Sequence, residues 1–570
     1  MSSAYHTLPA RSRVAQAGPN GSDGGAKRCK SRAQGMKALA MMAALLPALS
    51  GCGSGPVASV SPNSNDRLQS TRAAGNPQEV GPFNGGGWFS ADLRGAAVTD
   101  EPRAALVARD ILAAGGNAAD AAVGAYFALA VTMSSAAGLG GGGVCLVHDA
   151  EKETTDVFDF LPRAAKGGLV AVPGNVRGMA AINARYGRLP WARLVTPGAS
   201  LAGNGAAVSR AFSVELEAAG SRLSEDPLMA EIFTKDSAPL KEADNLRQVD
   251  LGAALERIRV GGVNEFYSGP LGRTLSDAAQ SIGAPLTIED LRAAKTVVYA
   301  PAAIEVGDQE LFFPAPPSAG GVLAAQMVTA LEQVDASKPA EVAKAVNGLI
   351  ADRNSWMKPG GDASKPVNDL VSSDHVRAAI NAKLDAPGVA VNENPSATGL
   401  VTMDSEGQGV ACEFTMNAPF GSARIAPGTG IILAPAPNEQ GAGFSALGPV
   451  MLANNNSGRL YFLAAGSGGT PADIAKAMVF DAVLNQEKPM DTAMQAGRLF
   501  ADGAGTVYVE DAVAGGQVAI AGAGFKVEPA DKLARVNAIY CPKSTPDSPD
   551  TCQFRNDYRG NGLLTTVNQQ

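Results

Sequence analysis

The stretch "NENPSATGLVTMDSEGQGVACEFTMN", residues 392–417, carries the strongest structural signal in the chain. Its Asp-Ser-Glu-Gly segment is typical of a hairpin turn and separates two apolar runs, which predicts a pair of antiparallel strands. A polar, Pro-containing loop leads into the first run, which begins next to Thr398. Two interpretations follow. Either the chain cuts itself here and uses the new N-terminal residue as a nucleophile, or a plain loop enters a sheet.

The region before this hairpin predicts helices followed by strands. A first helix has Pro102 in its first turn and stops at the Gly115-Gly116 pair, which breaks the apolar spacing. A second helix begins with Asn117 as its N-cap and is nearly apolar all round, which indicates burial on every side. Residues 136–160 then predict a Gly-rich turn and two strands joined by a charged hairpin.

The whole chain alternates between helical and strand-rich regions. Residues 175–300 are mainly helical, and strands return after residue 309. Helices at both ends with strands between them predict stacked sheets covered by helices, a layered α/β arrangement. The irregular stretch 355–396 is long for a compact domain, and such segments are usually functional, exposed or open to cleavage.

Composition narrows the class of protein. The 570 residues include 66 glycines and 45% apolar residues, which suits a globular chain with a large core. A net charge of −8 and the lack of a long basic stripe argue against nucleic-acid binding. The histidines are His6, His148 and His375, and none has a partner at metal-ligand spacing. We therefore expect no metal and no cofactor.

The N-terminal region is expected to be a targeting signal. Residues 1–52 form a leader in which an apolar run after Met36 is too short to span a membrane and ends in "LSGC". This ending resembles a bacterial lipobox, so we expect lipidation of Cys52; the alternative is an ordinary secretory signal that contains a cysteine. Met36 is the expected true start, with residues 1–35 an extension ahead of it. Residues 53–90 are expected to be a flexible tether that holds the protein to the envelope, facing the periplasm. Gly53 after the cysteine favours the outer membrane.

The other cysteines are consistent with an oxidising compartment. Cys541 and Cys552 flank the loop "CPKSTPDSPDTC", and a disulfide between them is expected. Cys145 and Cys412 lie in apolar strand-like runs, where a buried free thiol is the default expectation.

A series of short motifs runs along the chain from about Gly95 to Gly562. In order they are "ILAAGGNAADAAV", "GLGGGG", "VPGNVRGM", "RYGRLPW", "EFYSG", "LTIEDL", "PAPPSAGG", "FTMNAPFGS", "PGTGIIL" and "GSGGTP". Together they resemble the gamma-glutamyltransferases, also called glutathione hydrolases, of the N-terminal-nucleophile hydrolase superfamily. The resemblance implies a four-layer αββα fold and a precursor that cuts itself into residues 91–396 and 397–570, which stay associated as one domain. It also implies transfer of a gamma-glutamyl group to water or an amine.

The chemistry of such a site sets its own requirements. An N-terminal threonine uses its hydroxyl as nucleophile and its α-amine, with a pKa of about 8, as base, so no histidine is needed. Two backbone N–H groups must stabilise the oxyanion of the tetrahedral intermediate. A glutamyl donor also needs an arginine for its α-carboxylate and a carboxylate for its α-ammonium.

Several family positions are matched in this sequence. Gly468 and Gly469 correspond to the oxyanion glycines, although a plain turn after a strand explains them equally well. Thr415 and Asn417 match the Thr-x-Asn that holds nucleophile and substrate, and simple sheet hydrogen bonding is the alternative. Glu439 falls where the family has its amine-binding aspartate, and a surface-loop glutamate is the alternative.

Other positions depart from the family pattern. Leu161 stands where the carboxylate-binding arginine belongs; Arg163 could replace that arginine, but Pro162 disturbs the strand between them. Gly448 and Pro449 replace a Ser-Ser pair that also binds the carboxylate. These changes predict a substrate other than ordinary glutathione.

The nucleophile is the largest departure. Counting back without gaps from Thr415 and Asn417 places it at Ala397, and Thr398 stands one residue late. A shift of one residue would turn side chains to the opposite face of the strand, so the sequence favours a non-catalytic protein over an enzyme that uses Thr398. A non-catalytic protein would be an uncleaved chain that binds a ligand or another envelope protein, or else a structural lipoprotein.

Overall fold

The computed structural model describes residues 92–358, 361–382, 388–389, 396–437, 446–513 and 515–568. These residues belong to one unit that extends from Phe83 to Gln570. The leader, Cys52, the tether and Glu439 lie outside the described residues. No helix in the described part of the chain is long and apolar enough to cross a membrane.

Two antiparallel sheets form the centre of this unit. The first has seven strands, and its middle is the predicted hairpin with strands from the N-terminal half on both sides. In sheet order these strands are β22 (Leu563–Asn568), β1 (Leu93–Thr99), β11 (Ala397–Asp404), β12 (Gly409–Thr415), β2 (Gly142–Asp149), β3 (Thr154–Phe160) and β8 (Val297–Tyr299).

The second sheet has six strands and is built mainly from the C-terminal third of the chain. In sheet order they are β21 (Gln553–Arg555), β20 (Arg535–Thr545), β16 (Arg459–Ser467), β15 (Val450–Asn454), β10 (Gln309–Phe313) and β9 (Ala302–Val306). The two sheets face each other across an apolar layer to which Val401 and Met403 of β11 contribute, together with Leu463 of β16 and Ile539 of β20.

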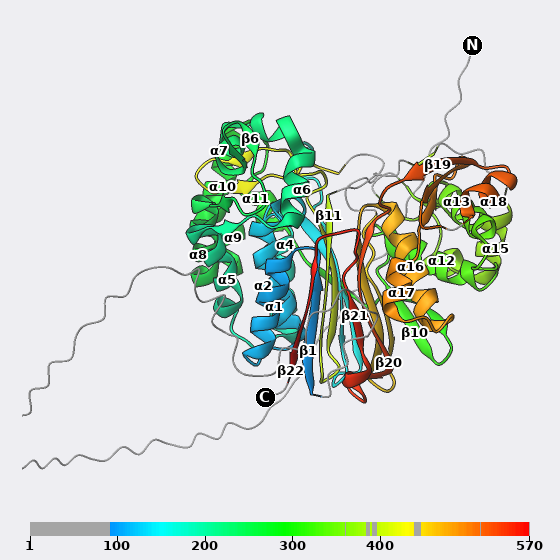
Figure 1. Cartoon of the computed structure of the whole chain (residues 1–570). Coiled ribbons are helices and arrows are strands. Elements are labelled where there is room, and N and C mark those ends of the chain that lie inside the picture. Colours follow the sequence, from blue (N-terminus) through cyan, green and yellow to red (C-terminus); the bar gives the residue numbers. More distant parts are fainter. Residues whose placement is uncertain are drawn as a thin grey trace, which may run out of the picture. The chain divides into compact units, whose positions relative to one another are not determined.

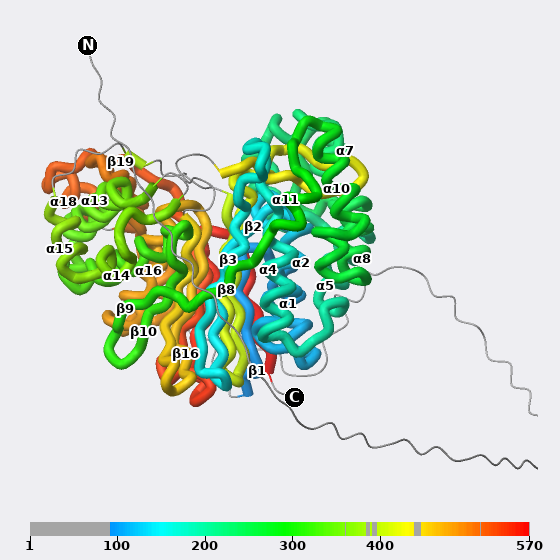
Figure 2. Tube along the Cα trace, turned by 180° about the vertical axis from the view of Figure 1, so that it is seen from behind, coloured from blue at the N-terminus to red at the C-terminus, as the bar shows by residue number. Residues whose placement is uncertain are grey.

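Helices cover the outer face of each sheet, as Figures 1 and 2 show. The first sheet is covered by α1 (Pro102–Ala113), α2 (Ala118–Thr132), α3 (Ser134–Ala137), α4 (Asn175–Tyr186), α5 (Trp191–Asn204), α6 (Arg210–Ala219), α7 (Pro227–Phe233), α8 (Val249–Gly261), α9 (Val263–Tyr267), α10 (Pro270–Ser281) and α11 (Ile288–Ala293). The second is covered by α12 (Gly320–Leu331), α13 (Pro339–Trp356), α14 (Val367–Leu370), α15 (Ser373–Asn381), α16 (Thr470–Leu484), α17 (Met490–Gln495) and α18 (Gly516–Gly522). The expected four-layer αββα fold is confirmed.

Four smaller sheets lie among the helices of the described residues. A three-stranded sheet joins β17 (Leu499–Ala501), β18 (Thr506–Glu510) and β19 (Lys526–Ala530) beside the second layer. Two-residue ribbons pair β4 (Ala206–Ala207) with β7 (Asn245–Leu246), β5 (Thr234–Lys235) with β6 (Ala238–Pro239), and β13 (Ile425–Ala426) with β14 (Ile431–Ile432).

Local sequence signals predicted several of these elements. At the start of α2, Asn117 and Asp120 form a capping box, in which the side chain of each accepts the backbone N–H of the other. Every residue of the helix is buried. The predicted hairpins are confirmed as β2–β3 and β11–β12. The stretch 355–396 was expected to be irregular, and there the structure differs: α14 and α15 lie within it, with Ser372 capping α15.

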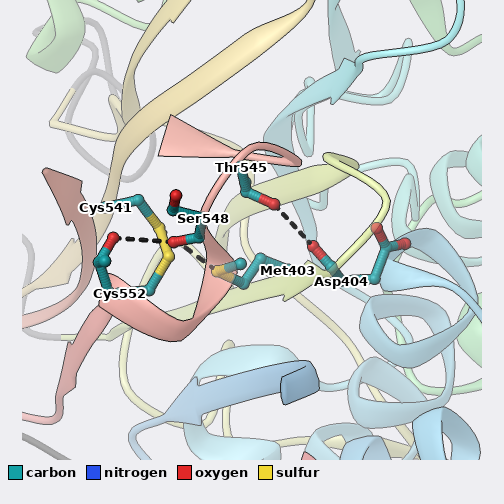
Figure 3. The surroundings of a disulfide bond; sticks show 7 residues. Met403, Asp404, Cys541, Thr545, Ser548 and Cys552 are labelled. Atoms are coloured by element: carbon teal, nitrogen blue, oxygen red, sulfur yellow. Dashed lines mark hydrogen bonds between the residues drawn. A yellow bond between two sulfur atoms is a disulfide. The ribbon is translucent and has the colours of Figure 1, made fainter. Parts of the chain in front are cut away.

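The cysteines give one agreement and one correction. Cys541 and Cys552 are disulfide-bonded, as their spacing predicts, and they lie against Met403 of β11 (Figure 3). Cys145 and Cys412 are not free thiols but form a second disulfide. They are directly opposite each other on the adjacent strands β2 and β12. The pairing of strands this far apart in sequence could not be read from the chain.

Candidate active site

The ends of four neighbouring strands meet at one edge of the first sheet. Ala397, the first residue of β11, pairs with Thr415, the last residue of β12. Thr415 also pairs with Gly142 at the start of β2, and the next residue of β2 pairs with Phe160 at the end of β3. The start of β11 and the end of β12 therefore lie beside the segment that follows β3.

The second sheet brings the Gly468-Gly469 pair to the same edge. A Cβ on Gly399 would lie 3.1 Å from the backbone of Ala465, and a Cβ on Gly409 would lie 2.4 Å from the side chain of Leu460. These two contacts fix how β16 crosses the β11–β12 hairpin. Gly468 and Gly469 follow β16 at the edge where β11 begins.

The geometry of the two glycines suits an oxyanion site. Their φ angles are 108° and 76°, in the left-handed region that favours glycine. Neither of their backbone N–H groups donates a hydrogen bond to another described residue. The pair also stands at the N-terminus of α16, the positive end of the helix dipole. Both N–H groups thus remain available to an anion.

The start of β11 presents a different hydroxyl from the one predicted. Ser396 lies just before the strand, is buried, and has its Oγ 3.3 Å from Thr415 Oγ1. Ala397 turns its methyl group into the apolar layer between the sheets. Thr398 points to the opposite face, where its hydroxyl donates to Asp100 at 3.1 Å. The structure therefore brings Thr415 together with Ser396 and not with Thr398.

Asn417 connects the end of β12 to the segment after β3. Its backbone N–H donates to Thr415 Oγ1 at 2.9 Å, and its Nδ2 donates to the carbonyl oxygens of Pro162 and Pro435 at 3.1 and 3.0 Å. Asn417 has a φ of 60°, which this short polar side chain tolerates better than most. Its Oδ1 is buried and has no hydrogen-bond partner among the described residues.

Arg163 lies near this edge but is already paired. Its guanidinium donates to both carboxylate oxygens of Asp159 at 3.0 and 2.6 Å, and its side chain remains 44% exposed. Leu161, at the position of the family arginine, is buried in the layer between the sheets. Burial, followed by the nearby Asp159, raises the pKa of Tyr299 beside this pair. A substrate carboxylate at Arg163 would therefore have to share the guanidinium with Asp159.

A buried charge cluster lies below the edge, two residues inside the strands. Glu413 of β12 accepts the N–H groups of Gly466 and Gly448, each at 2.6 Å. Lys476 of α16 donates to Glu413 at 2.6 Å and lies 3.0 Å from Asp473. Burial raises the pKa of Asp473 to about 7. The cluster holds the end of β16, and hence the glycine pair, in position over β12.

A second polar group ties the start of β11 to the second sheet. Asp100, which follows β1, accepts the N–H of Gly399 at 3.0 Å and the amide of Asn537 from β20 at 2.9 Å. Arg535 donates to Ser467 Oγ at 2.9 Å. Burial acts to lower the pKa of Arg535, but the carboxylates of Asp100 and Glu215 raise it. These contacts tie β1, β11, β16 and β20 together beside the site.

The sequence identified some of these residues and missed others. Thr415, Asn417 and the glycine pair were found from motifs, and all of them lie at one edge. Ser396 was missed because its motif position carries no catalytic residue in the family, and Asp100 and Glu413 were missed because isolated carboxylates give no pattern. No group of three or more His, Cys, Asp or Glu suited to a metal ion occurs among the described residues.

Comparison with known proteins shows which family the chain belongs to. The gamma-glutamyltranspeptidase family model matches residues 104–168 and 163–565. The chain belongs to this family. It is 31% identical over 393 residues to the glutathione hydrolase proenzyme of Escherichia coli (strain K12), a match that covers 62% of this chain and 67% of that protein. It is 30% identical over 380 residues to the acylase ACY 1 proenzyme of Pseudomonas sp. (strain V22), covering 60% of this chain and 68% of that one.

A solved structure has a similar fold over most of the length of this chain. The crystal structure of cephalosporin acylase from Bacillus halodurans matches with a TM-score of 0.73 and 20% identity, covering 87% of this chain and 99% of that one. At this identity the likeness concerns the fold.

Proposed function

We propose that the protein is a self-processing enzyme that hydrolyses or transfers a gamma-glutamyl or related acyl group held in an amide bond. Membership of the gamma-glutamyltranspeptidase family supports gamma-glutamyl hydrolysis or transfer in general. The observation that carries the proposal is that the hydroxyl pair of Ser396 and Thr415, where β11 begins and β12 ends, lies at the same edge of the sheets as Gly468 and Gly469, whose N–H groups have no partner among the described residues. A nucleophile and an oxyanion site are the two components that acyl transfer requires.

The order of strands would hold the two fragments together after a cut. We call residues before the cut at the start of β11 the large fragment and the remainder the small fragment. In the first sheet β1, β2, β3 and β8 come from the large fragment, and β11, β12 and β22 come from the small one. Because β11 pairs with β1 and β12 pairs with β2, the fragments cannot separate without breaking the sheet.

The substrate is proposed to differ from glutathione in how its acyl part is recognised. Arg163 is held by Asp159, Leu161 is buried, and Gly448 offers only a backbone N–H that Glu413 already accepts. None of these provides the free cation or hydroxyl that an α-carboxylate would need. Relatives of this chain include acylase proenzymes as well as glutathione hydrolases, so a non-glutamyl acyl group is included in the proposal.

A second candidate is an uncleaved binding protein. It is favoured by Ala397, which offers no hydroxyl at the position reached by counting back from Thr415. In either case we propose that the mature chain is lipid-anchored through Cys52 and faces the periplasm. Cys52→Ala should then move the protein from the membrane fraction to the soluble fraction.

Two measurements on the mature protein test the enzyme against the binder. We expect two fragments on a denaturing gel run with reductant, and release of the aromatic amine from a gamma-glutamyl or another acyl anilide. A heat-denatured sample is the control for spontaneous hydrolysis. A single full-length band without turnover of any acyl anilide would instead establish the uncleaved binding protein.

A further inference from the structure

The start of β11 offers three positions for the nucleophile, and the structure distinguishes them. Ala397 has no hydroxyl. The hydroxyl of Thr398 donates to Asp100 on the face of the sheet away from Thr415. Leu400, two residues later on the same face, packs into the helix-covered core. Ser396 precedes the paired part of β11, so the alternation of the strand does not set the direction of its side chain. Ser396 alone has its hydroxyl beside Thr415.

We propose that Ser396 is the nucleophile and that the chain is cut on its amino side, so that the small fragment begins at residue 396. This inference rests on the proposed function and names the residue that carries it. It shifts the cut one residue before the family register, which falls on Ala397.

The contacts of Thr415 support this role for Ser396. Thr415 Oγ1 already accepts the N–H of Asn417 at 2.9 Å. Its own hydroxyl hydrogen is available to the Ser396 Oγ, which lies 3.3 Å away. A hydrogen bond donated to Oγ stabilises the developing negative charge when the serine loses its proton. Thr415 is thus a positioning residue, and its contribution depends on a hydroxyl at residue 396.

The position of Ser396 relative to the sheet also favours a cut before it. The β11–β12 pairing begins with Ala397 opposite Thr415, so Ser396 stands just outside the ladder. A cut on its amino side leaves all of β11 intact. A cut before Thr398 would remove Ala397 from β11 and break the pairing that holds Thr415 in place.

The self-cleavage needs only water. Ser396 Oγ attacks the carbonyl carbon of residue 395, the C–N bond breaks, and the hydroxyl proton passes to the leaving nitrogen, which yields an ester. Water then adds to the ester carbonyl, which restores the Ser396 hydroxyl and leaves a carboxyl group on residue 395. The freed α-amine has a pKa of about 8 and can accept the hydroxyl proton in each later acyl transfer.

The test compares the wild type with Ser396→Ala, Ser396→Cys and the control Ser405→Ala at the far end of the same hairpin. In the wild type, mass spectrometry should find a small fragment that begins at Ser396. Ser396→Ala should remain one chain and lose at least about a thousandfold in turnover, because the whole nucleophilic step is removed. Ser405→Ala should behave as the wild type. Circular dichroism establishes that each variant is folded.

Ser396→Cys keeps the proposal testable if Ser396→Ala is poorly folded. The thiol should still cut the chain, and iodoacetamide should then label residue 396 and stop turnover, with no such effect on the wild type. A small fragment that begins at Ala397 or Thr398, or cleavage that Thr398→Val stops and Ser396→Ala does not, would overturn the assignment while the proposed function stands. An uncut, inactive wild type would overturn both.

Discussion

At the residue scale, three consecutive side chains at the start of β11 meet three different surroundings. Ser396 contacts the Thr415 hydroxyl, Ala397 enters the apolar layer between the sheets, and Thr398 contacts Asp100. Ala397 is paired with Thr415 and shares its face of the sheet, but it has no hydroxyl. Ser396 stands outside the paired strand, and it is the contact of its Oγ with Thr415 Oγ1 on which catalytic activity would depend.

Gly468→Ala tests the oxyanion site. An ideal Cβ there would lie 2.9 Å from Ala534 Cα, and the φ of 108° disfavours any side chain. We expect a loss of about 1–3 kcal/mol in unfolding free energy from backbone strain. We also expect a loss of about a hundredfold or more in turnover, because one N–H donor is displaced. Urea unfolding and anilide turnover measure the two effects.

The control for this change is Gly505→Ala. Gly505 has a similar φ of 97°, but a Cβ there meets nothing within 4 Å. It should lose stability through the φ angle alone and keep its turnover. Equal turnover in Gly468→Ala and the wild type would show that the glycine pair does not bind an oxyanion.

Sequence motifs identified the residues whose amino-acid type is itself part of a family pattern. Thr415, Asn417 and Gly468 fall in patterns that survive in the sequence, and the structure places them together. Ser396 could not be found in this way, because its contact with Thr415 depends on the geometry just before a strand. The Cys145–Cys412 disulfide was missed for a related reason: each strand was predicted, but their pairing across 267 residues was not.

At the element scale, the Glu413–Lys476–Asp473 cluster joins β12, β16 and α16. One ammonium lies between two carboxylates, and all three side chains are almost fully buried. Glu413 accepts two backbone N–H groups as well as the ammonium of Lys476, whereas neither oxygen of Asp473 makes a hydrogen bond within the described residues. Burial raises the pKa of Asp473 to about 7, although the ammonium of Lys476 lies 3.0 Å away and acts to lower it.

The raised pKa of Asp473 makes the unfolding free energy fall as pH rises. The folded protein loses the Asp473 proton at a pKa of about 7, while the unfolded chain loses it near the ordinary aspartate value of 3.8. The folded state therefore binds more protons between these values, so this contribution to stability falls as pH rises through the window. The limiting slope for one proton is about 1.4 kcal/mol per pH unit.

Asp473→Asn should remove that contribution, because the amide stays neutral at every pH. We expect its unfolding free energy, measured in urea at several values between pH 5 and 7, to fall less steeply with pH than that of the wild type. The exposed Asp374→Asn is the control for a lost carboxyl. Parallel curves for Asp473→Asn and the wild type would contradict a protonated Asp473.

At the scale of the whole molecule, the fold could be predicted as layers but not as a strand order. The alternation of helices and strands predicts two covered sheets, and the family motifs predict the αββα arrangement. Neither shows that the C-terminal β22 lies beside the N-terminal β1, or that β11 and β12 fill the middle of the first sheet. Such non-local pairings are set by the packing of the complete chain.

The same strand order places one disulfide across the proposed cut. Cys145 belongs to the large fragment and Cys412 to the small one, whereas Cys541 and Cys552 both belong to the small fragment. The sheet holds the fragments together only while the protein is folded. The Cys145–Cys412 bond would keep them joined even in denaturant.

A cut protein should therefore run as one band on a denaturing gel without reductant and as two bands with it. The Cys145→Ala/Cys412→Ala double variant should show two bands under both conditions, and its unfolding free energy should fall by about 2–5 kcal/mol. The Cys541→Ala/Cys552→Ala variant, which loses a disulfide within one fragment, should still run as one band without reductant. Two bands from the unreduced wild type would show that Cys145 and Cys412 do not pair, and one band under reduction would show that the chain is not cut.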